Sequence, residues 1–237
     1  LPLLVGFDIT ILLSQALSQV VIFAGSALFF SYLFHGSPSA YLRLVTPSGG
    51  KRHFVYVIPV LLLILPASDW LTTVNEAWHL PSSLATLEEF LRQQGELSQQ
   101  ILMSFLLRDG VGDLFLNLLV LAIVPALCEE LFFRGALQQT LENCFKGNHH
   151  LAVWLTAAIF SLMHGDFFAF LPRFLLGLLL GYLFYYSRSL WVNAMAHFVN
   201  NALAVLLYFL AAHSVISIDD AENFGLPFVV VALSFAA

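Results

Sequence analysis

Charged side chains are scarce in this sequence. Only 10% of the 237 residues are Asp, Glu, Lys or Arg, whereas 59% are hydrophobic, and the mean hydropathy is +0.86. A water-soluble domain of this length could not bury so much apolar surface in a single core. With only nine basic residues, the chain also lacks the footprint of a nucleic-acid-binding protein. The composition therefore predicts a protein whose solvent is mostly lipid, with no nucleic-acid partner.

Cysteine is scarce as well, and this excludes a disulfide framework. Cys128 and Cys144 lie 16 positions apart on what is expected to be one continuous helix, too far apart to bridge within it. The chain opens at Leu1 rather than Met, so we expect residues to be missing from the natural N-terminus. The first apolar run is too long for the core of a signal peptide and is expected to span the membrane.

Apolar runs of the length of a membrane span recur along the chain. A spanning helix needs roughly 20 apolar residues. We therefore predict an all-α fold: a polytopic transmembrane helical bundle of about seven spans, forming a single membrane domain over residues 1–237. The expected spans are 9–34, 54–74, 111–133, 151–168, 170–187, 190–212 and 225–237.

Residues 81–108 follow a different pattern, in which leucine, isoleucine and phenylalanine recur near helical spacing among Gln, Glu and Ser. This pattern predicts one amphipathic helix lying at the membrane interface. The basic residues of the other loops lie in the first, third and fifth connections between the expected spans, which predicts that these loops are cytoplasmic. They are Arg43, Lys51, Arg52, Lys146 and Arg188.

Two adjacent carboxylates, Glu129 and Glu130, lie in the expected span 111–133. A charge at the bilayer centre costs at least about 2.5–3.5 kcal/mol, so such residues normally face the protein interior and have a task. Glu130 and Arg134 are four residues apart and share a helix face, so they can pair. Glu129 is turned about 100° away and is left free for chemistry. The alternative is that both glutamates only hold helices together, or lie beyond the headgroups.

Two histidines and an asparagine accompany these carboxylates on other expected spans. His164 lies on the fourth, and Asn193, His197 and Asn201 form one stripe on the sixth. A lone histidine in a membrane is commonly an interhelical hydrogen-bonding residue. However, Glu130 and His164 both lie 17 residues from Gly147, where the third and fourth spans are expected to turn. The carboxylates and His164 are therefore expected to meet at a similar depth.

This set of residues suits the hydrolysis of a peptide bond. A carboxylate beside a neutral imidazole can hold and deprotonate a water molecule, and a second imidazole with a carboxamide can donate hydrogen bonds to the oxyanion that forms. Zinc held by two histidines and a glutamate stays open by ligand type. Because the candidate ligands are dispersed over three helices without a His-Glu-x-x-His pairing, we expect no metal or other cofactor. Cys128 is expected to be a small apolar residue rather than a nucleophile.

The three polar motifs resemble those of the CPBP family, which joins the type II CAAX prenyl endopeptidases to bacterial homologues linked to bacteriocin processing and self-immunity. The resemblance covers about residues 111–212, and all three motifs occur in order. They are Glu129-Glu130-x-x-x-Arg134, Phe160-x-x-x-His164 and His197-x-x-x-Asn201.

The resemblance implies an intramembrane glutamic endopeptidase of the bacterial inner membrane, with 111–212 as its catalytic core and its site open toward the cytoplasm. It implies that Glu129 activates water with His164, and that His197 and Asn201 stabilise the oxyanion. Glu130 and Arg134 would be supporting residues. The expected partners are the lipid bilayer and a peptide or protein substrate, with or without a lipid modification.

Two other functions use the same bundle. A non-catalytic member could bind a membrane peptide as an immunity or scaffold protein, and it would not need Glu129. A proton-coupled transporter could use the carboxylates as a relay, although the sequence shows no evident inverted repeat of the kind that many transporters have.

Overall fold

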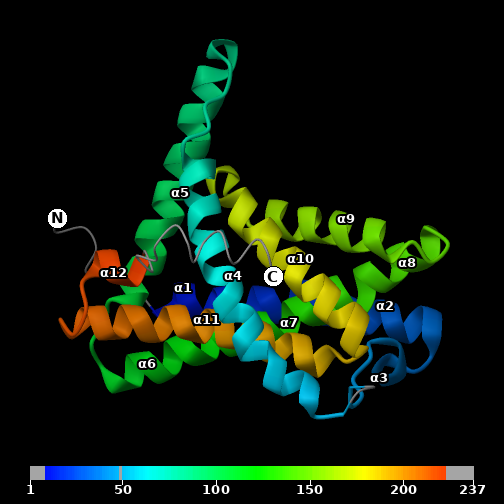
Figure 1. The fold of residues 1–237 in the computed structure, drawn as a ribbon. Helices are drawn as coiled ribbons and strands as arrows, with labels where there is room; N and C mark the ends of the chain where they lie inside the picture. The colour runs from blue at the N-terminus through cyan, green and yellow to red at the C-terminus, as the bar shows by residue number, and fades with distance from the viewer. Residues whose placement is uncertain (1–8, 48–49, 223–237) are drawn as a thin grey trace.

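In the computed structural model, residues 9–47 and 50–222 are described, and their regular structure is entirely helical (Figure 1). The fold class predicted from the sequence is confirmed. The α-helices are α1 (Ile9–Ser18), α2 (Ser26–His35), α3 (Pro38–Tyr41), α4 (Arg52–Glu76), α5 (Ala85–Leu106), α6 (Val111–Asn117), α7 (Val124–Glu130), α8 (Gln139–Cys144), α9 (His149–Leu162), α10 (Phe170–Ser187), α11 (Leu190–Ala212) and α12 (Ile218–Glu222). Short 3₁₀ segments are η2 (Ser82–Leu84) and η5 (Phe167–Ala169), and π-helical segments are η1 (Gln19–Gly25), η3 (Leu118–Ile123) and η4 (Leu131–Gln138).

Several of these segments join end to end into longer helices. Within the described residues, five helices are long and apolar enough to cross a membrane, by length and composition. They match five of the seven expected spans. They are Ile9–His35, Arg52–Glu76, Val111–Cys144, Phe167–Ser187 and Leu190–Ala212.

The remaining two expected spans have different outcomes. The apolar run 151–168 forms α9, which has 14 residues and ends at Leu162. At about 1.5 Å per residue, a helix of this length is shorter than the hydrocarbon core of a bilayer. The chain turns at Gly165, whose φ is +71°, and the apolar sequence continues into η5 and α10. The expected span 225–237 lies outside the described residues.

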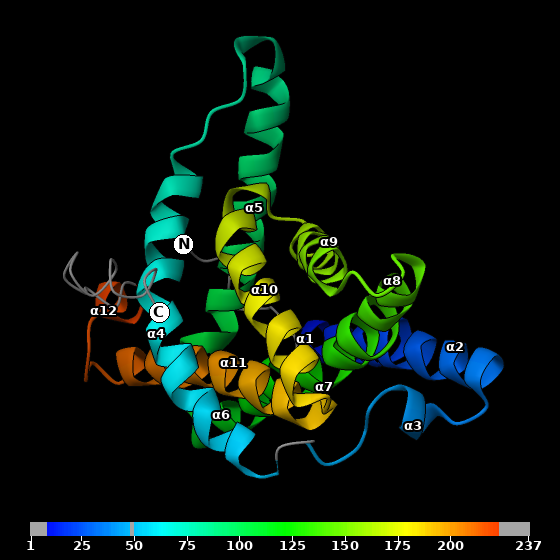
Figure 2. The ribbon, with the colours of Figure 1, turned by 45° about the vertical axis from the view of Figure 1, so that its right-hand side comes forward.

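The amphipathic segment predicted over 81–108 forms α5, a helix of 22 residues. Figures 1 and 2 show α4 and α5 as a hairpin whose connecting loop projects beyond the other helices. At this loop, Glu88 accepts hydrogen bonds from the backbone N–H of Leu80 at 2.7 Å and from His79 at 2.9 Å. Glu88 also accepts a hydrogen bond from Arg92 at 3.0 Å, so one carboxylate closes the hairpin.

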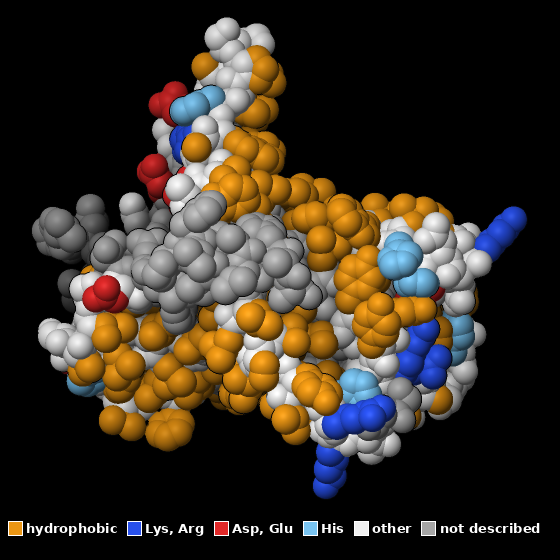
Figure 3. Space-filling view, viewed as in Figure 1, with side chains coloured by type: hydrophobic (Ala, Val, Ile, Leu, Met, Phe, Trp, Pro, Cys, Tyr) orange, Lys and Arg blue, Asp and Glu red, His pale blue; other side chains and the backbone are white. Residues whose placement is uncertain are grey.

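The loops that carry the expected cytoplasmic charges meet at one end of the bundle. The backbone N–H of Leu190 donates to the carbonyl of Arg43 at 3.0 Å, and Arg188 lies 3.5 Å from Glu142. In Figure 3 most of the visible Lys and Arg side chains gather at the right-hand end of the molecule. The chain therefore has one basic end, formed by the connections α2–α4, α8–α9 and α10–α11.

Two glycines allow α10 to pack closely on α9. A Cβ atom added at Gly177 would lie 3.0 Å from the Cα of Ala157, and one added at Gly181 would lie 2.7 Å from a methyl carbon of Val153. The sequence predicts a packing role for these glycines, as small residues let membrane helices approach. Their carbonyl groups are also acceptors: Arg134 donates to Gly177 O at 3.1 Å.

Candidate active site

The helix that carries the two glutamates has a π-helical segment before them and another after them. α7 lies between the π-helical segments η3 and η4, and such segments occur frequently at functional sites. Pro125, near the start of α7, has no N–H to donate to the carbonyl of Leu121. The side chain of Asn201 donates to this carbonyl at 3.3 Å. The irregular backbone of the third span thus anchors an expected site residue of α11.

Glu130 and Arg134 form the pair that their spacing predicts. Arg134 Nη1 lies 2.7 Å from Glu130 Oε1, and both side chains are fully buried. The guanidinium of Arg134 also lies 4.8 Å from the ring centroid of Phe160, close enough for a cation–π contact. Paired in this way, the two charges are compensated inside the bundle.

His197 joins the two glutamates. Its Nδ1 donates to Glu130 Oε1 at 2.9 Å, and its Nε2 lies 4.0 Å from Glu129 Oε2. Asn193, one turn earlier on α11, donates to Glu130 Oε2 at 3.4 Å. Glu130 is therefore held by three side chains and in turn fixes the ring of His197.

Glu129 has a different environment from Glu130. Its Oε1 accepts a hydrogen bond from Gln19 Nε2 at 2.9 Å. Its Oε2 is buried and has no hydrogen-bond partner among the described residues. A buried carboxylate oxygen without a partner is costly, so this atom is available to bind a water molecule or a substrate group.

His164 lies just beyond the end of α9. Its Nδ1 donates to the carbonyl of Phe160 at 2.8 Å, and the ring of Phe160 lies edge-on to it with the centroids 4.8 Å apart. Because Nδ1 is the donor, Nε2 of the neutral ring is left as an acceptor. The short α9 and the turn at Gly165 bring this histidine to the pocket, where it is partly exposed.

The predicted site residues meet at one pocket of about 320 Å³. Glu129, His164, His197 and Asn201 all line it, whereas Glu130 and Arg134 lie behind it. The division between a free Glu129 and a supporting Glu130, inferred from helical spacing, matches this placement.

Three polar residues of the pocket were not singled out from the sequence as part of the site: Gln15, Gln19 and Arg173. Gln15 and Gln19 are four residues apart on the first apolar run. Two polar residues on one face of an apolar helix indicate a functional site, so this spacing could have predicted that Gln15 and Gln19 belong to it. Arg173, in the first turn of α10, forms an ion pair of 3.2 Å with Asp166.

The absence of a metal ion from the site stays a prediction. Among residues 9–47 and 50–222, no group of three or more His, Cys, Asp or Glu side chains is placed to hold one. Glu130 is already bound to Arg134, and His197 Nδ1 is bound to Glu130. The mechanism proposed for this site uses no metal ion.

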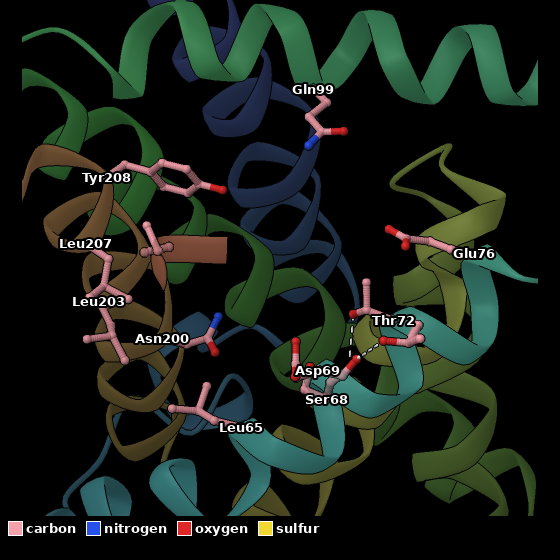
Figure 4. Close-up of a pocket in the computed structure, with 13 residues that line it drawn as sticks. Leu65, Ser68, Asp69, Thr72, Glu76, Gln99, Asn200, Leu203, Leu207 and Tyr208 are labelled. Atoms are coloured by element: carbon pink, nitrogen blue, oxygen red, sulfur yellow. Dashed lines mark hydrogen bonds between the residues drawn. The ribbon is translucent and has the colours of Figure 1, made fainter. Parts of the chain in front are cut away.

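A second pocket, of about 450 Å³, adjoins the first and shares Asn200 and Ala204 with it. Figure 4 shows Asn200 and Leu203 on α11 facing Asp69 and Thr72 on α4, with Gln99 of α5 above them. The side chains that line this pocket are largely polar or acidic. The two pockets together make a longer depression that begins at Glu129.

Both pockets lie away from the basic end of the bundle. α10 reaches that end at Ser187, whereas the pocket residues Arg173 and Leu176 lie near its first residue. His164 likewise follows the far end of α9. The sequence predicts cytoplasmic basic loops and, by resemblance, a site open to the cytoplasm. Glu129 and Asn201 lie near the middle of their helices, so the side to which the site opens stays a prediction.

The resemblance seen in the motifs is confirmed by comparison with known proteins. Residues 111–203 match a family described as type II CAAX prenyl endopeptidase Rce1-like, and this range contains all the predicted site residues. No curated protein and no solved structure matches the chain. Residues 111–203 of this integral membrane protein are therefore similar to the Rce1-like type II CAAX prenyl endopeptidases, as the three motifs predict.

Proposed function

We propose that the protein is an intramembrane endopeptidase in which Glu129 activates the water that attacks the peptide bond. The observation that carries this proposal is the environment of Glu129 Oε2. This oxygen is buried, has no partner among the described residues, and belongs to a side chain that lines the same pocket as His164 and His197. The family match over residues 111–203 supports a protease in general. The glutamate-based mechanism is a more specific proposal.

In the proposed first step, Glu129 and His164 hold the attacking water. Glu129 Oε2 and the free Nε2 of His164 are both acceptors, so one water molecule can donate a hydrogen bond to each. The water oxygen attacks the peptide carbonyl carbon as Glu129 takes its proton. Glu129 then passes this proton to the amide nitrogen, the C–N bond breaks, and the carboxylate is regenerated.

Asn201 and His197 are proposed to stabilise the oxyanion formed in that step. The Asn201 amide uses one N–H on the carbonyl of Leu121, while its oxygen accepts from Asn200 at 3.2 Å. Its second N–H is available to an oxyanion. His197 can also donate from Nε2 when both ring nitrogens carry protons. Donors of this kind typically contribute roughly 10²–10³-fold to turnover.

The substrate is proposed to be a peptide segment presented at the membrane, with or without a lipid modification. An endopeptidase must hold residues on both sides of the bond that it cuts. The second pocket continues from the first through Asn200 and Ala204 (Figure 4) and offers room for such a segment. Figure 3 shows that much of the visible outer surface is apolar, as expected where lipid and a lipid-embedded substrate approach.

The proposal is tested with purified protein in liposomes against a library of membrane-associated peptides. Wild type should cleave members of the library, and Glu129→Ala and His164→Ala should each lose at least about 100-fold in kcat/KM, as general-base residues typically do. Unchanged cleavage in either variant would refute the mechanism. Peptide binding by wild type without cleavage would instead support the non-catalytic alternative.

A second measurement addresses the metal. Because the proposed mechanism uses no metal ion, cleavage should persist after chelation, with metal removal verified by elemental analysis. Loss of activity that added zinc restores would overturn this part of the proposal.

A further inference from the structure

Gln19 lies outside the residues that match the family, on the first apolar helix at the start of η1. It is 110 positions from Glu129 in sequence, yet the two side chains are hydrogen-bonded at 2.9 Å. A glutamine in a membrane-spanning helix is costly unless its amide is bonded within the protein. The position of this polar residue therefore needs a reason.

The contact is selective for one oxygen of Glu129. Gln19 Nε2 donates to Oε1, and Oε2 is left without a partner among the described residues. A carboxylate turns about its terminal bond easily because that torsion has a broad energy profile. A donor fixed to one oxygen stops this rotation and keeps the other oxygen directed at the pocket.

The packing of the π-helical segment η1 brings Gln19 close to Glu129. η1 packs against α7 and against η4, which follows it; the ring of Phe23 in η1 lies 5.6 Å from that of Phe133 in η4. Gln15, one turn before Gln19, lines the same pocket without a contact to Glu129 that resembles this one. Of these two glutamines on the first helix, Gln19 is the one that reaches the carboxylate.

We propose that Gln19 is a positioning residue for the peptidase reaction: it holds Glu129 so that Oε2 meets the attacking water. This inference rests on the proposed function. It implies that the first membrane helix, which lies outside the family match, completes the site. The Oε1 atom of Gln19 itself is buried, has no hydrogen-bond partner within residues 9–47 and 50–222, and can accept an N–H from a bound peptide.

The test compares two substitutions of similar length at Gln19. Gln19→Met keeps the volume but has no donor, and Gln19→Glu replaces the donor with a second carboxylate. Ser18→Ala is the matched control, because Ser18 is exposed and its hydroxyl bonds only to the carbonyl of Ser14 one turn earlier. Each variant is assayed in liposomes for kcat and KM, and its unfolding is measured in the same preparation.

Gln19→Met should lower kcat roughly 10- to 100-fold, as expected on losing a hydrogen bond to a charged group, with KM changed less than about 2-fold. Gln19→Glu should lower kcat further, and Ser18→Ala should leave both constants unchanged. A purely structural role would move the unfolding midpoint and leave the folded enzyme's kcat unaltered. If Gln19→Met retains wild-type kcat while Glu129→Ala is inactive, the inference on Gln19 fails and the proposed function stands; if wild type shows no Glu129-dependent cleavage, the proposed function itself fails.

Discussion

Adjacent glutamates on one helix turn have different surroundings in this protein. Glu130 is bonded to Arg134, His197 and Asn193, whereas Glu129 is bonded to Gln19 through one oxygen only. Charges in a low-dielectric interior need compensation. The contacts of Glu130 suit a residue that holds its neighbours in place, whereas the unpaired oxygen of Glu129 suits a residue that binds water.

Removing one partner of the Glu130–Arg134 pair should strongly destabilise the bundle. Arg134→Met leaves a buried carboxylate without its counter-charge, at a cost of about 3–5 kcal/mol. In the double variant Glu130→Leu/Arg134→Met no buried charge is left unpaired, so part of that loss should be recovered. Reversible unfolding in detergent measures both. Additive losses in the two single and the double variants would contradict a direct pairing.

At the residue level, helical spacing was sufficient to predict the Glu130–Arg134 pair and the free Glu129. It could not predict the bond between Gln19 and Glu129, because that contact depends on how the first helix packs against α7. Nor could it predict that Asn201 binds the carbonyl of Leu121, which requires both Pro125 and the register of α11. Roles assigned to Glu129, His164, His197 and Asn201 stay predictions until activity is measured.

At the scale of elements, the contact between α9 and α10 positions His164. Gly177→Ala should force these helices apart, because the new Cβ would lie 3.0 Å from the backbone of Ala157. A loss of about 1–3 kcal/mol is expected from such overpacking. Gly112→Ala, also in a helix, meets nothing within 4 Å and is the control. Equal unfolding midpoints for the two variants would contradict close packing here.

The α4–α5 hairpin should loosen in acid. The pKa of Glu88 is lowered from its ordinary value of 4.5, first by the hydrogen bond from the backbone of Leu80 and then by His79. A lowered pKa means that Glu88 stabilises the hairpin at pH values above the ordinary pKa, and that this contribution is lost as the pH falls through the lowered one. Protection of the Leu80 amide, measured as its exchange rate relative to the intrinsic rate at the same pH, should therefore fall below about pH 4.5.

Glu88→Gln should show fast exchange of the Leu80 amide already at neutral pH. Glu89→Gln is the matched control, because Glu89 is exposed and contacts Gln93 only weakly, at 3.4 Å. If the two variants exchange at the same rate, Glu88 does not close the hairpin.

Hydropathy located five of the long helices but gave the wrong length for the run 151–168. The apolar sequence continues past Leu162, whereas the backbone turns at Gly165 with a positive φ. Apolar composition does not report this turn, because residues on both sides of it, such as Met163 and Phe167, are themselves apolar. The same turn is what brings His164 to the pocket.

At the scale of the whole molecule, the unequal distribution of basic residues predicts orientation. If the basic end is cytoplasmic, exposed Cys144 near that end should react with a membrane-impermeant maleimide only from the cytoplasmic side. Buried Cys128 should not react in the folded protein, and Cys144→Ser should abolish labelling. Labelling from the opposite side only would contradict the cytoplasmic position of the basic end.

The sequence alone could not resolve this orientation. Loop charge predicts which loops are cytoplasmic and the resemblance predicts where the site opens, but neither locates the pocket relative to the loops. Glu129 and Asn201 lie near the middle of their helices, so loop charge alone does not report the side to which the pocket opens.

The most direct test of the central claim compares two carboxylates of one continuous helix, Val111–Cys144. Glu129→Gln removes the proposed base but keeps its shape, and Glu142→Gln makes the same change near the basic end, outside the pocket. With both variants folded in liposomes, Glu129→Gln should lose at least about 100-fold in kcat, while Glu142→Gln should match wild type. Cleavage by Glu129→Gln at the wild-type rate would contradict glutamate-activated hydrolysis.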